Sequence, residues 1–179
     1  NGGLLPRGAC SGGYSFIMTG CPATNMLVST YMKDLMKKTK PSHAYEAIKR
    51  NHAPGGMMSY ESADDLKFYV KKGYCPGNAG KTLEWAFQDW GLSRMALRMG
   101  KKSDAALYEK RSRAWTPLFN KNIGLILPKK ENGEWLHTDP LNGQGWVEAN
   151  AWQATWSVSH DLPKLVELMG GGDAFCEKL

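Results

Sequence analysis

Residues 81–99, KTLEWAFQDWGLSRMALRM, form the longest helical pattern in this chain. Its apolar residues recur at helical spacing, but they fall on two faces instead of one. A helix that is apolar on two sides is buried between neighbouring helices. The stretch therefore predicts a long central helix covered by others, with one face formed by Leu83, Ala86, Phe87 and Trp90 and the other by Leu92, Met95, Ala96 and Met99.

Shorter helical patterns lie on both sides of this stretch. Their starts and ends are marked by capping residues, by proline in the first turn and by glycine after the last turn. The chain shows no strand–helix–strand alternation, so it predicts a mostly α fold of antiparallel helix pairs. The expected helices run over about 23–37, from 41 to the residue before Pro54, from Ser62 to 72, from 103 to about 119, from near Asn150, and from Asp161 to Gly170.

One segment departs from the helical pattern. Residues 124–128 (GLILP) and 134–136 (EWL) read as short extended pieces, and the Asn132-Gly133 pair between them is a turn signal. Loops of this kind between regular elements often carry functional residues. The sequence thus predicts a small β-hairpin excursion near 124–136.

The composition is that of a globular protein with a substantial core. The chain has 179 residues, of which 42% are hydrophobic and 22% charged, and no apolar run approaches the length of a membrane span. The net charge of +6 comes from scattered lysine pairs, not from one basic stripe, so nucleic-acid binding is not expected. The four cysteines lack zinc-site spacing, and they are either buried thiols or members of one or two disulfides.

The richest chemistry lies in residues 145–156, GWVEANAWQATW, where one carboxylate stands among three tryptophans and two amides. Aromatic faces pack on sugar C–H surfaces, amides pair with hydroxyls, and a carboxylic acid can protonate a glycosidic oxygen. The segment therefore suggests a sugar-cleaving pocket, although a helix start with tryptophans in the core explains these residues as well. In the pocket interpretation Glu148 is the acid, and the substrate-binding residues are Trp146, Asn150, Trp152 and Gln153.

Four segments, in matching order and spacing, resemble glycoside hydrolase family 92, the calcium-dependent exo-acting α-mannosidases. Residues 82–90 (TLEWAFQDW) are similar to the family's TLEYAYDDW helix, and residues 108–112 (YEKRS) to its YxKRS stretch. Residues 148–153 (EANAWQ) resemble its EGNAWQ motif, and residues 159–161 (SHD) with 168–171 (LMGG) resemble its PHD…LMGG ending. A looser likeness extends over nearly the whole chain.

This resemblance implies an (α/α)6 catalytic toroid that follows a β-sandwich domain. Residues 1–179 would then be a single segment of the catalytic domain, forming about half of the toroid. The resemblance also implies inversion at the anomeric carbon, a bound Ca2+, and secretion to the periplasm or the exterior, although no signal peptide heads the chain. Glu148 matches the family's general acid, and Asn150 is the candidate calcium ligand through its side chain or a nearby carbonyl.

Two departures from the family pattern bear on function. Polar residues that the family commonly carries near Gly12–Tyr14 and at Cys21-Pro22 are absent, which leaves the linkage cleaved and the preference for α-mannosides open. The GNEPxH and GNDDxG motifs, which hold the family's main acidic calcium ligand and its general-base aspartate, do not occur in this chain. We therefore expect the 179 residues to hold the acid without the base, and to be inactive without the rest of the catalytic domain and the β-sandwich.

The leading functional prediction is hydrolysis of terminal α-mannosides in glycans by an inverting, calcium-dependent mechanism, as part of a longer enzyme. One alternative is another helical-toroid glycosidase with a different sugar preference. The other is a non-catalytic carbohydrate-binding or scaffold fragment.

The remaining ionisable residues of interest have structural interpretations. Within this chain the candidates for a general base are Asp139 and Asp161. However, Asp139, which precedes Pro140, is expected to form a turn, and Asp161 is expected to cap a helix. For His160 we expect a structural hydrogen bond. Carboxylates on the central helix would be costly to bury alone, so Glu84 and Asp89 are expected to pair with Arg94 or Arg111.

Overall fold

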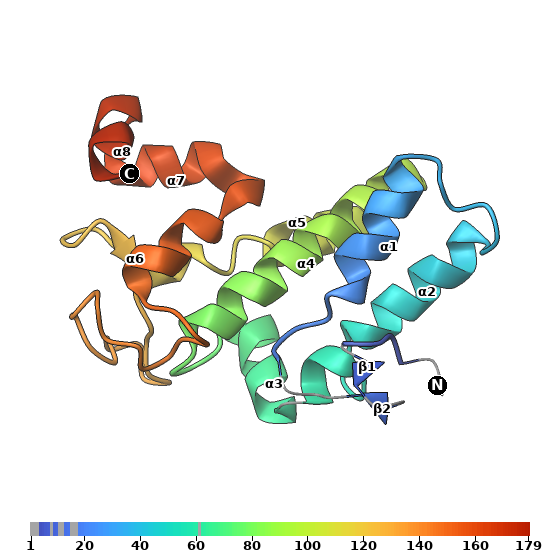
Figure 1. Cartoon of the computed structure of the whole chain (residues 1–179), viewed down its shortest axis with the longest axis horizontal. Helices are drawn as coiled ribbons and strands as arrows, with labels where there is room; N and C mark the ends of the chain where they lie inside the picture. The colour runs from blue at the N-terminus through green and yellow to red at the C-terminus, as the bar shows by residue number, and fades with distance from the viewer. Residues whose placement is uncertain (1–3, 8, 11–12, 15–17, 61) are drawn as a thin grey trace.

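The structure, a computed structural model, describes residues 4–7, 9–10, 13–14, 18–60 and 62–179, and it is mostly helical (Figure 1). The central helix α4 spans Ala79–Arg98, close to the predicted bounds. Asn78 caps its start by accepting a hydrogen bond from the Lys81 N–H at 2.8 Å. Thirteen of the 20 residues of α4 are buried, which confirms the prediction of a central helix covered on two sides.

Three helices precede α4, and each begins where the sequence predicts. They are α1 (Ala23–Met32), α2 (Pro41–Asn51) and α3 (Ala63–Lys72), with a 3-10 turn, η1 (Met57–Tyr60), between the last two. The Ser62 side chain caps α3 by accepting from the Asp65 N–H at 3.1 Å, and Gly73 ends it at φ +87°. Local capping chemistry therefore sets both ends of α3.

The helix predicted to reach residue 37 ends earlier, at Met32. Arg98 in the last turn of α4 donates to the carbonyl oxygens of Tyr31 and Met32 at 3.1 and 2.6 Å, and so satisfies groups that the next helical turn would have used. The helical spacing of Met26, Leu27, Tyr31 and Leu35 predicts one buried stripe, but Met26 and Leu35 are 61% and 59% exposed. The buried residues of α1 are Ala23, Thr24 and Val28.

Helix α5 (Lys102–Arg111) returns antiparallel along α4 after a turn at Gly100 (Figure 1). It was predicted to extend to Phe119, and this prediction is wrong. Pro117 lies inside the predicted extension, where it would lack the N–H for a helical hydrogen bond and would clash with the preceding turn. The chain instead forms turns and the 3-10 helix η2 (Thr116–Leu118).

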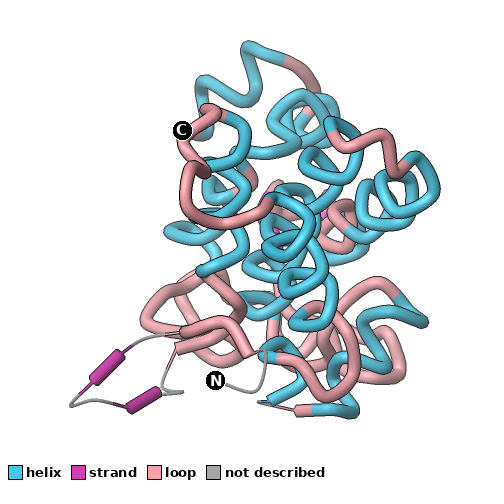
Figure 2. The backbone as a smooth tube through the Cα atoms, turned by 90° about the vertical axis from the view of Figure 1, so that its right-hand side faces the viewer, coloured by secondary structure: helices cyan, strands magenta, loops and turns pink. Residues whose placement is uncertain are grey.

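The predicted β excursion is present, but its main pairing is different. Strand β4 (Leu125–Ile126) pairs antiparallel with β3 (Phe119–Asn120), which precedes it. Within the predicted hairpin, Lys129 and Trp135 form a single antiparallel bridge. A second two-stranded ribbon, β1 (Ala9–Cys10) with β2 (Gly13–Tyr14), lies at the edge of the molecule (Figure 2).

The C-terminal part forms a further helical group beside the N-terminal half of α4. It contains α6 (Ala151–Ala154), the 3-10 turns η3 (Thr155–Ser157) and η4 (Ser159–Asp161), α7 (Leu162–Met169) and α8 (Gly172–Lys178). Helix α7 has its predicted bounds, whereas α8 was not predicted. Asp161 precedes α7 as expected, but its side chain caps no N–H. Pro163, at the second helical position, has no N–H that could donate a hydrogen bond to the Asp161 carboxylate.

Helix α4 joins two hydrophobic cores. Its C-terminal half, with Leu92 and Met95, packs against α1, α2 and α5. Its N-terminal half, with Leu83 and Trp85, belongs to a larger core that includes α3, the β3–β4 segment and the C-terminal helices. Among the residues that the structure describes, no helix is long and apolar enough to cross a membrane.

Candidate active site

The loop that carries Glu148 is fastened to the start of α4. The Gly80 N–H donates to the Gly145 carbonyl oxygen at 3.2 Å, and the loop lies beside the N-terminal end of α4 in Figure 1. Gly145 has φ +85°, and a Cβ there would lie 2.7 Å from Cβ of Pro128 and 2.9 Å from the Gly77 oxygen. Only glycine fits this position, because any side chain would meet both strain and a clash.

Glu148 itself has an unusual backbone. Its φ is +53°, and Asp34 is the only other non-glycine residue at positive φ in the part of the chain that the structure describes. Its side chain is exposed to solvent. The left-handed conformation is costly for a residue with a Cβ, and residues in such conformations are common at functional sites.

A groove of about 390 Å³ lies next to Glu148. Val147 and Ala149, the two neighbours of Glu148, both line it, together with the buried Trp146. Helix α4 contributes further lining residues. These are Gly80, Leu83, Glu84 and Phe87.

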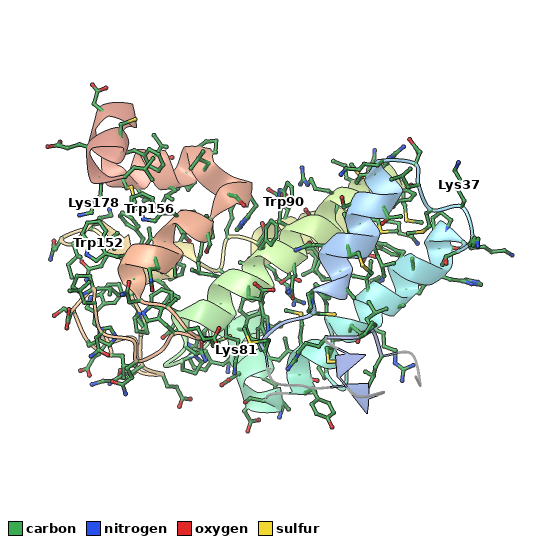
Figure 3. The ribbon with its side chains drawn as sticks, in the orientation of Figure 1. Lys37, Lys81, Trp90, Trp152, Trp156 and Lys178 are labelled. Carbon is green, nitrogen blue, oxygen red and sulfur yellow. The ribbon has the colours of Figure 1, made fainter. Side chains whose placement is uncertain are left out.

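The other two tryptophans of the segment have different surroundings. The Lys178 ammonium lies 5.3 Å from the ring centre of Trp152, which is 39% exposed. Trp156 packs edge-to-face on Phe175, with ring centres 5.7 Å apart. Figure 3 shows Trp152, Trp156 and Lys178 together beside α6 and α8. Of the three tryptophans, only Trp146 is among the residues that line the groove.

Asn150 and Gln153, the two predicted sugar-binding amides, form a capping box at the start of α6. The Asn150 side-chain oxygen accepts from the Gln153 N–H, and the Gln153 side-chain oxygen accepts from the Asn150 N–H, both at 3.1 Å. The three-residue spacing of a capping residue and glutamine is a sequence signal for this arrangement. The box occupies both carbonyl oxygens and leaves the amino groups outside it.

Asp89 lies at the centre of a buried network. Its carboxylate accepts from Arg111 Nε at 2.8 Å, which confirms the predicted pairing, and from the Tyr69 hydroxyl at 2.9 Å. His52 Nδ1 lies 2.8 Å from the same carboxylate, and His52 Nε2 lies 2.8 Å from the Thr24 hydroxyl. Burial lowers the pKa of His52, which favours a neutral ring that donates to Asp89 and accepts from Thr24.

This Thr24–His52–Asp89 arrangement has the order of a hydrolytic triad. However, the three residues are between 0% and 1% exposed, so no substrate can reach them. The network is structural, and it connects α1, α2, α4 and α5.

His160 and Asp139 also have structural hydrogen bonds, as predicted. His160 Nε2 donates to the Ser112 carbonyl oxygen at 3.0 Å, and burial lowers the pKa of this ring. Asp139 accepts from the Leu141 N–H at 2.9 Å and so forms a turn. Glu84 lines the groove, and it accepts from the Gln88 side chain.

A calcium ion takes six to eight oxygen ligands from carboxylates, backbone and amide carbonyls, and water. Among the described residues, no three or more of the histidine, cysteine, aspartate and glutamate side chains are grouped to hold a metal ion. The side-chain oxygen of Asn150 already accepts a hydrogen bond, and its remaining lone pair offers one ligand at most. These residues therefore do not form a calcium site by themselves.

An exposed acid beside a groove lined by aromatic residues suits the chemistry of a glycoside hydrolase. The comparison with known proteins agrees with this class: residues 1–179 match the sequence model of the glycosyl hydrolase family 92 catalytic domain. The chain belongs to glycoside hydrolase family 92.

Similar proteins are known in sequence and in structure. An uncharacterised secreted glycosidase of Arthroderma benhamiae is 24% identical in an alignment that covers 99% of this chain and 28% of that protein. A family 92 inverting mannosidase from Bacteroides thetaiotaomicron has 29% identity and a TM-score of 0.89, over 98% of this chain and 25% of its own. A family 92 α-mannosidase from the same bacterium has 24% identity and a TM-score of 0.85, over 98% of this chain and 23% of its own.

These structural neighbours confirm the predicted architecture, because the enzymes of this family have an α/α toroid. The chain spans about a quarter of the length of the relatives that it matches.

Proposed function

We propose that this chain supplies the general acid for the hydrolysis of terminal α-mannosides in glycans, with inversion at the anomeric carbon. The observation that carries the proposal is the position of Glu148, in a left-handed backbone conformation on a loop anchored to α4, beside the groove. Membership of family 92 supports the reaction class, and the mannosidases among the similar structures support the sugar.

In this proposal Glu148 donates a proton to the oxygen of the leaving group as the glycosidic bond breaks. Trp146 lines the groove beside it and offers an aromatic surface for the sugar. An inverting enzyme also needs a base about 6.5–9.5 Å from the acid to activate water. Asp139 is engaged in its turn and Asp161 is partly buried, so we assign the base to another part of the enzyme.

Calcium dependence belongs to the same proposal. Asn150 would contribute one oxygen ligand at most, and the acidic ligands would come from outside this chain. A secreted or periplasmic location is proposed as well, and the secreted relative supports it. The remaining catalytic domain and a β-sandwich domain are the proposed partners, and the isolated chain is proposed to be inactive.

Proton NMR of the reaction tests this proposal. The enzyme that contains this segment is mixed with an α-linked mannobiose, and the anomeric signals of released mannose are followed from the first minutes. We expect β-mannose to appear first and the α anomer to grow by mutarotation. Binding of the disaccharide without hydrolysis would favour the non-catalytic alternative, and α-mannose as first product would contradict inversion.

A further inference from the structure

The groove beside Glu148 contains a second carboxylate, which the proposed mechanism does not use. Glu84, on α4, lines the groove together with Trp146, Val147 and Ala149. Among the described residues that line the groove, Glu84 is the only one with a charged side chain. The groove therefore has one strong hydrogen-bond acceptor in an otherwise mostly apolar lining.

The position of this carboxylate is fixed by its neighbours. Gln88, one turn further along α4, donates from its side-chain nitrogen to Glu84, and the Gln88 side-chain oxygen accepts from the Cys21 N–H at 2.7 Å. A Cβ at Gly20 would lie 2.5 Å from Cγ of Glu84, so the backbone of Gly20 packs closely against this side chain. Glu84 is thus held on a rigid helix, between a hydrogen-bonding partner and a close backbone.

The chemistry of the groove suits a sugar ring. An ionised carboxylate only accepts hydrogen bonds. Its two oxygens can accept hydrogen bonds from two sugar hydroxyl groups at once. Trp146 and Phe87 line the same groove, and aromatic surfaces suit sugar C–H groups. A volume of about 390 Å³ lies at the small end of the range for small-molecule sites.

We infer that Glu84 is a substrate-recognition residue, whose carboxylate accepts hydrogen bonds from hydroxyl groups of the sugar that this groove binds. This inference rests on the proposed function, because it takes the groove to serve the reaction of Glu148. It goes further by assigning the recognition of individual hydroxyls to a residue on the central helix.

A set of deoxy-mannosides tests the inference in the enzyme that contains this segment. For wild type and for Glu84→Gln, kcat/KM is measured on an α-mannoside and on analogues that each lack one hydroxyl group. We expect Glu84→Gln to lower kcat/KM by about 10- to 100-fold on the complete mannoside, as for a lost hydrogen bond to a charged group. For at least one deoxy analogue, the wild-type enzyme should show a similar drop in kcat/KM relative to the complete mannoside. Removal of that same hydroxyl should lower kcat/KM of Glu84→Gln almost no further.

Glu109→Gln is the matched control, because Glu109 also packs on α4 through Ser93 but does not line the groove. It should leave the kinetics of every analogue unchanged. The same deoxy penalties in Glu84→Gln as in wild type would overturn the inference, since they would show that Glu84 contacts no hydroxyl.

Two further measurements distinguish a lost hydrogen bond to the sugar from a misfolded variant. Thermal unfolding of each variant shows whether Glu84→Gln is folded, and Glu84→Asp keeps the charge while withdrawing it by one methylene group. We expect Glu84→Asp to lower kcat/KM less than Glu84→Gln does, and the hydroxyl whose removal matters less than in wild type should be the same one. If wild type releases no mannose at all, the proposed function fails; if wild type is active and Glu84→Gln matches it, only the recognition role fails.

Discussion

The N–H of Gly80, in the first turn of α4, donates a hydrogen bond to the carbonyl oxygen of Gly145 at 3.2 Å. This bond links the central helix to the loop that carries Glu148, three residues further on. The loop approaches so closely that Gly145 has no room for a side chain. The position of the proposed acid therefore depends on contacts with α4.

Substitution of Gly145 by alanine should disturb both stability and activity. The new methyl group would meet Pro128 and the Gly77 oxygen, and the residue would keep a φ of +85° or force the loop to move. We expect a loss of about 2–4 kcal/mol in the free energy of unfolding. Urea denaturation measures this loss, and kcat should fall because the loop carries Glu148.

Alanine substitutions at two other glycines distinguish the cost of the positive φ from the cost of the steric clash. Gly133 has φ +88° but open space around its Cβ position, so Gly133→Ala should cost only about 1 kcal/mol from the backbone. Gly143 has neither positive φ nor a close contact, so Gly143→Ala should be nearly neutral. Equal losses for Gly145→Ala and Gly143→Ala would contradict the close docking of the loop.

The buried network around Asp89 should be far more sensitive than the surface ion pairs. Asp89→Asn would leave the Arg111 guanidinium, which is 11% exposed, without its counter-charge. We expect a loss of about 3–5 kcal/mol in unfolding free energy. Glu167→Gln, which removes an exposed pair with Lys164, should change it by less than about 1 kcal/mol. A small effect of Asp89→Asn would show that the network is not a structural centre.

Stability should fall as the pH is lowered through the histidine range. Burial lowers the pKa of His52 and His160, so below about pH 6.5 the unfolded chain binds protons that the folded chain does not. The loss continues down to the lowered folded-state pKa values. The shifts of Asp104 and Glu134 act only at lower pH, near the ordinary range of carboxylates.

Urea denaturation at several pH values between about 7.5 and 5 checks this slope. His160→Gln can keep the hydrogen bond to Ser112 without titrating, so its slope should be smaller than that of wild type. A free energy of unfolding that stays constant down to pH 5 would contradict the lowered pKa values of the buried His52 and the half-buried His160.

Much of the fold follows from local signals in the sequence. The two apolar faces of α4, the Ser62 cap and the Gly73 and Gly170 endings all depend on residues within a few positions, and all were predicted. The end of α1 was not predicted. It depends on Arg98, which is distant in sequence and contacts the last turn of α1 only when α4 packs against α1.

The candidate site was predictable only in part. The sequence singled out Glu148 and Trp146, which lie in or beside the groove. It did not show that Asn150 and Gln153 would bond to each other's backbone, although their spacing contains this signal. The groove position of Glu84 depends on long-range packing between α4 and the 145–149 loop, which no local pattern reveals.

Asn150 allows its two proposed roles to be separated. Asn150→Ala removes the cap of α6 and should cost about 1 kcal/mol, whereas Asn150→Ser keeps a capping oxygen and should cost little. If Asn150 is also a calcium ligand, as proposed, both variants should raise the calcium concentration needed for half-maximal activity of the enzyme. An unchanged calcium dependence would restrict Asn150 to its capping role.

If Glu148 protonates the leaving group, the effect of Glu148→Gln on kcat must depend on how much protonation the leaving group needs. In the enzyme that contains this segment, kcat is measured on an α-linked mannobiose and on an aryl mannoside whose leaving group needs little protonation. Exposed Glu131, changed to Gln, serves as the control. We predict that Glu148→Gln lowers kcat on the disaccharide by about 10²- to 10⁴-fold and on the aryl mannoside by much less. Full activity of Glu148→Gln on the disaccharide would contradict the assignment.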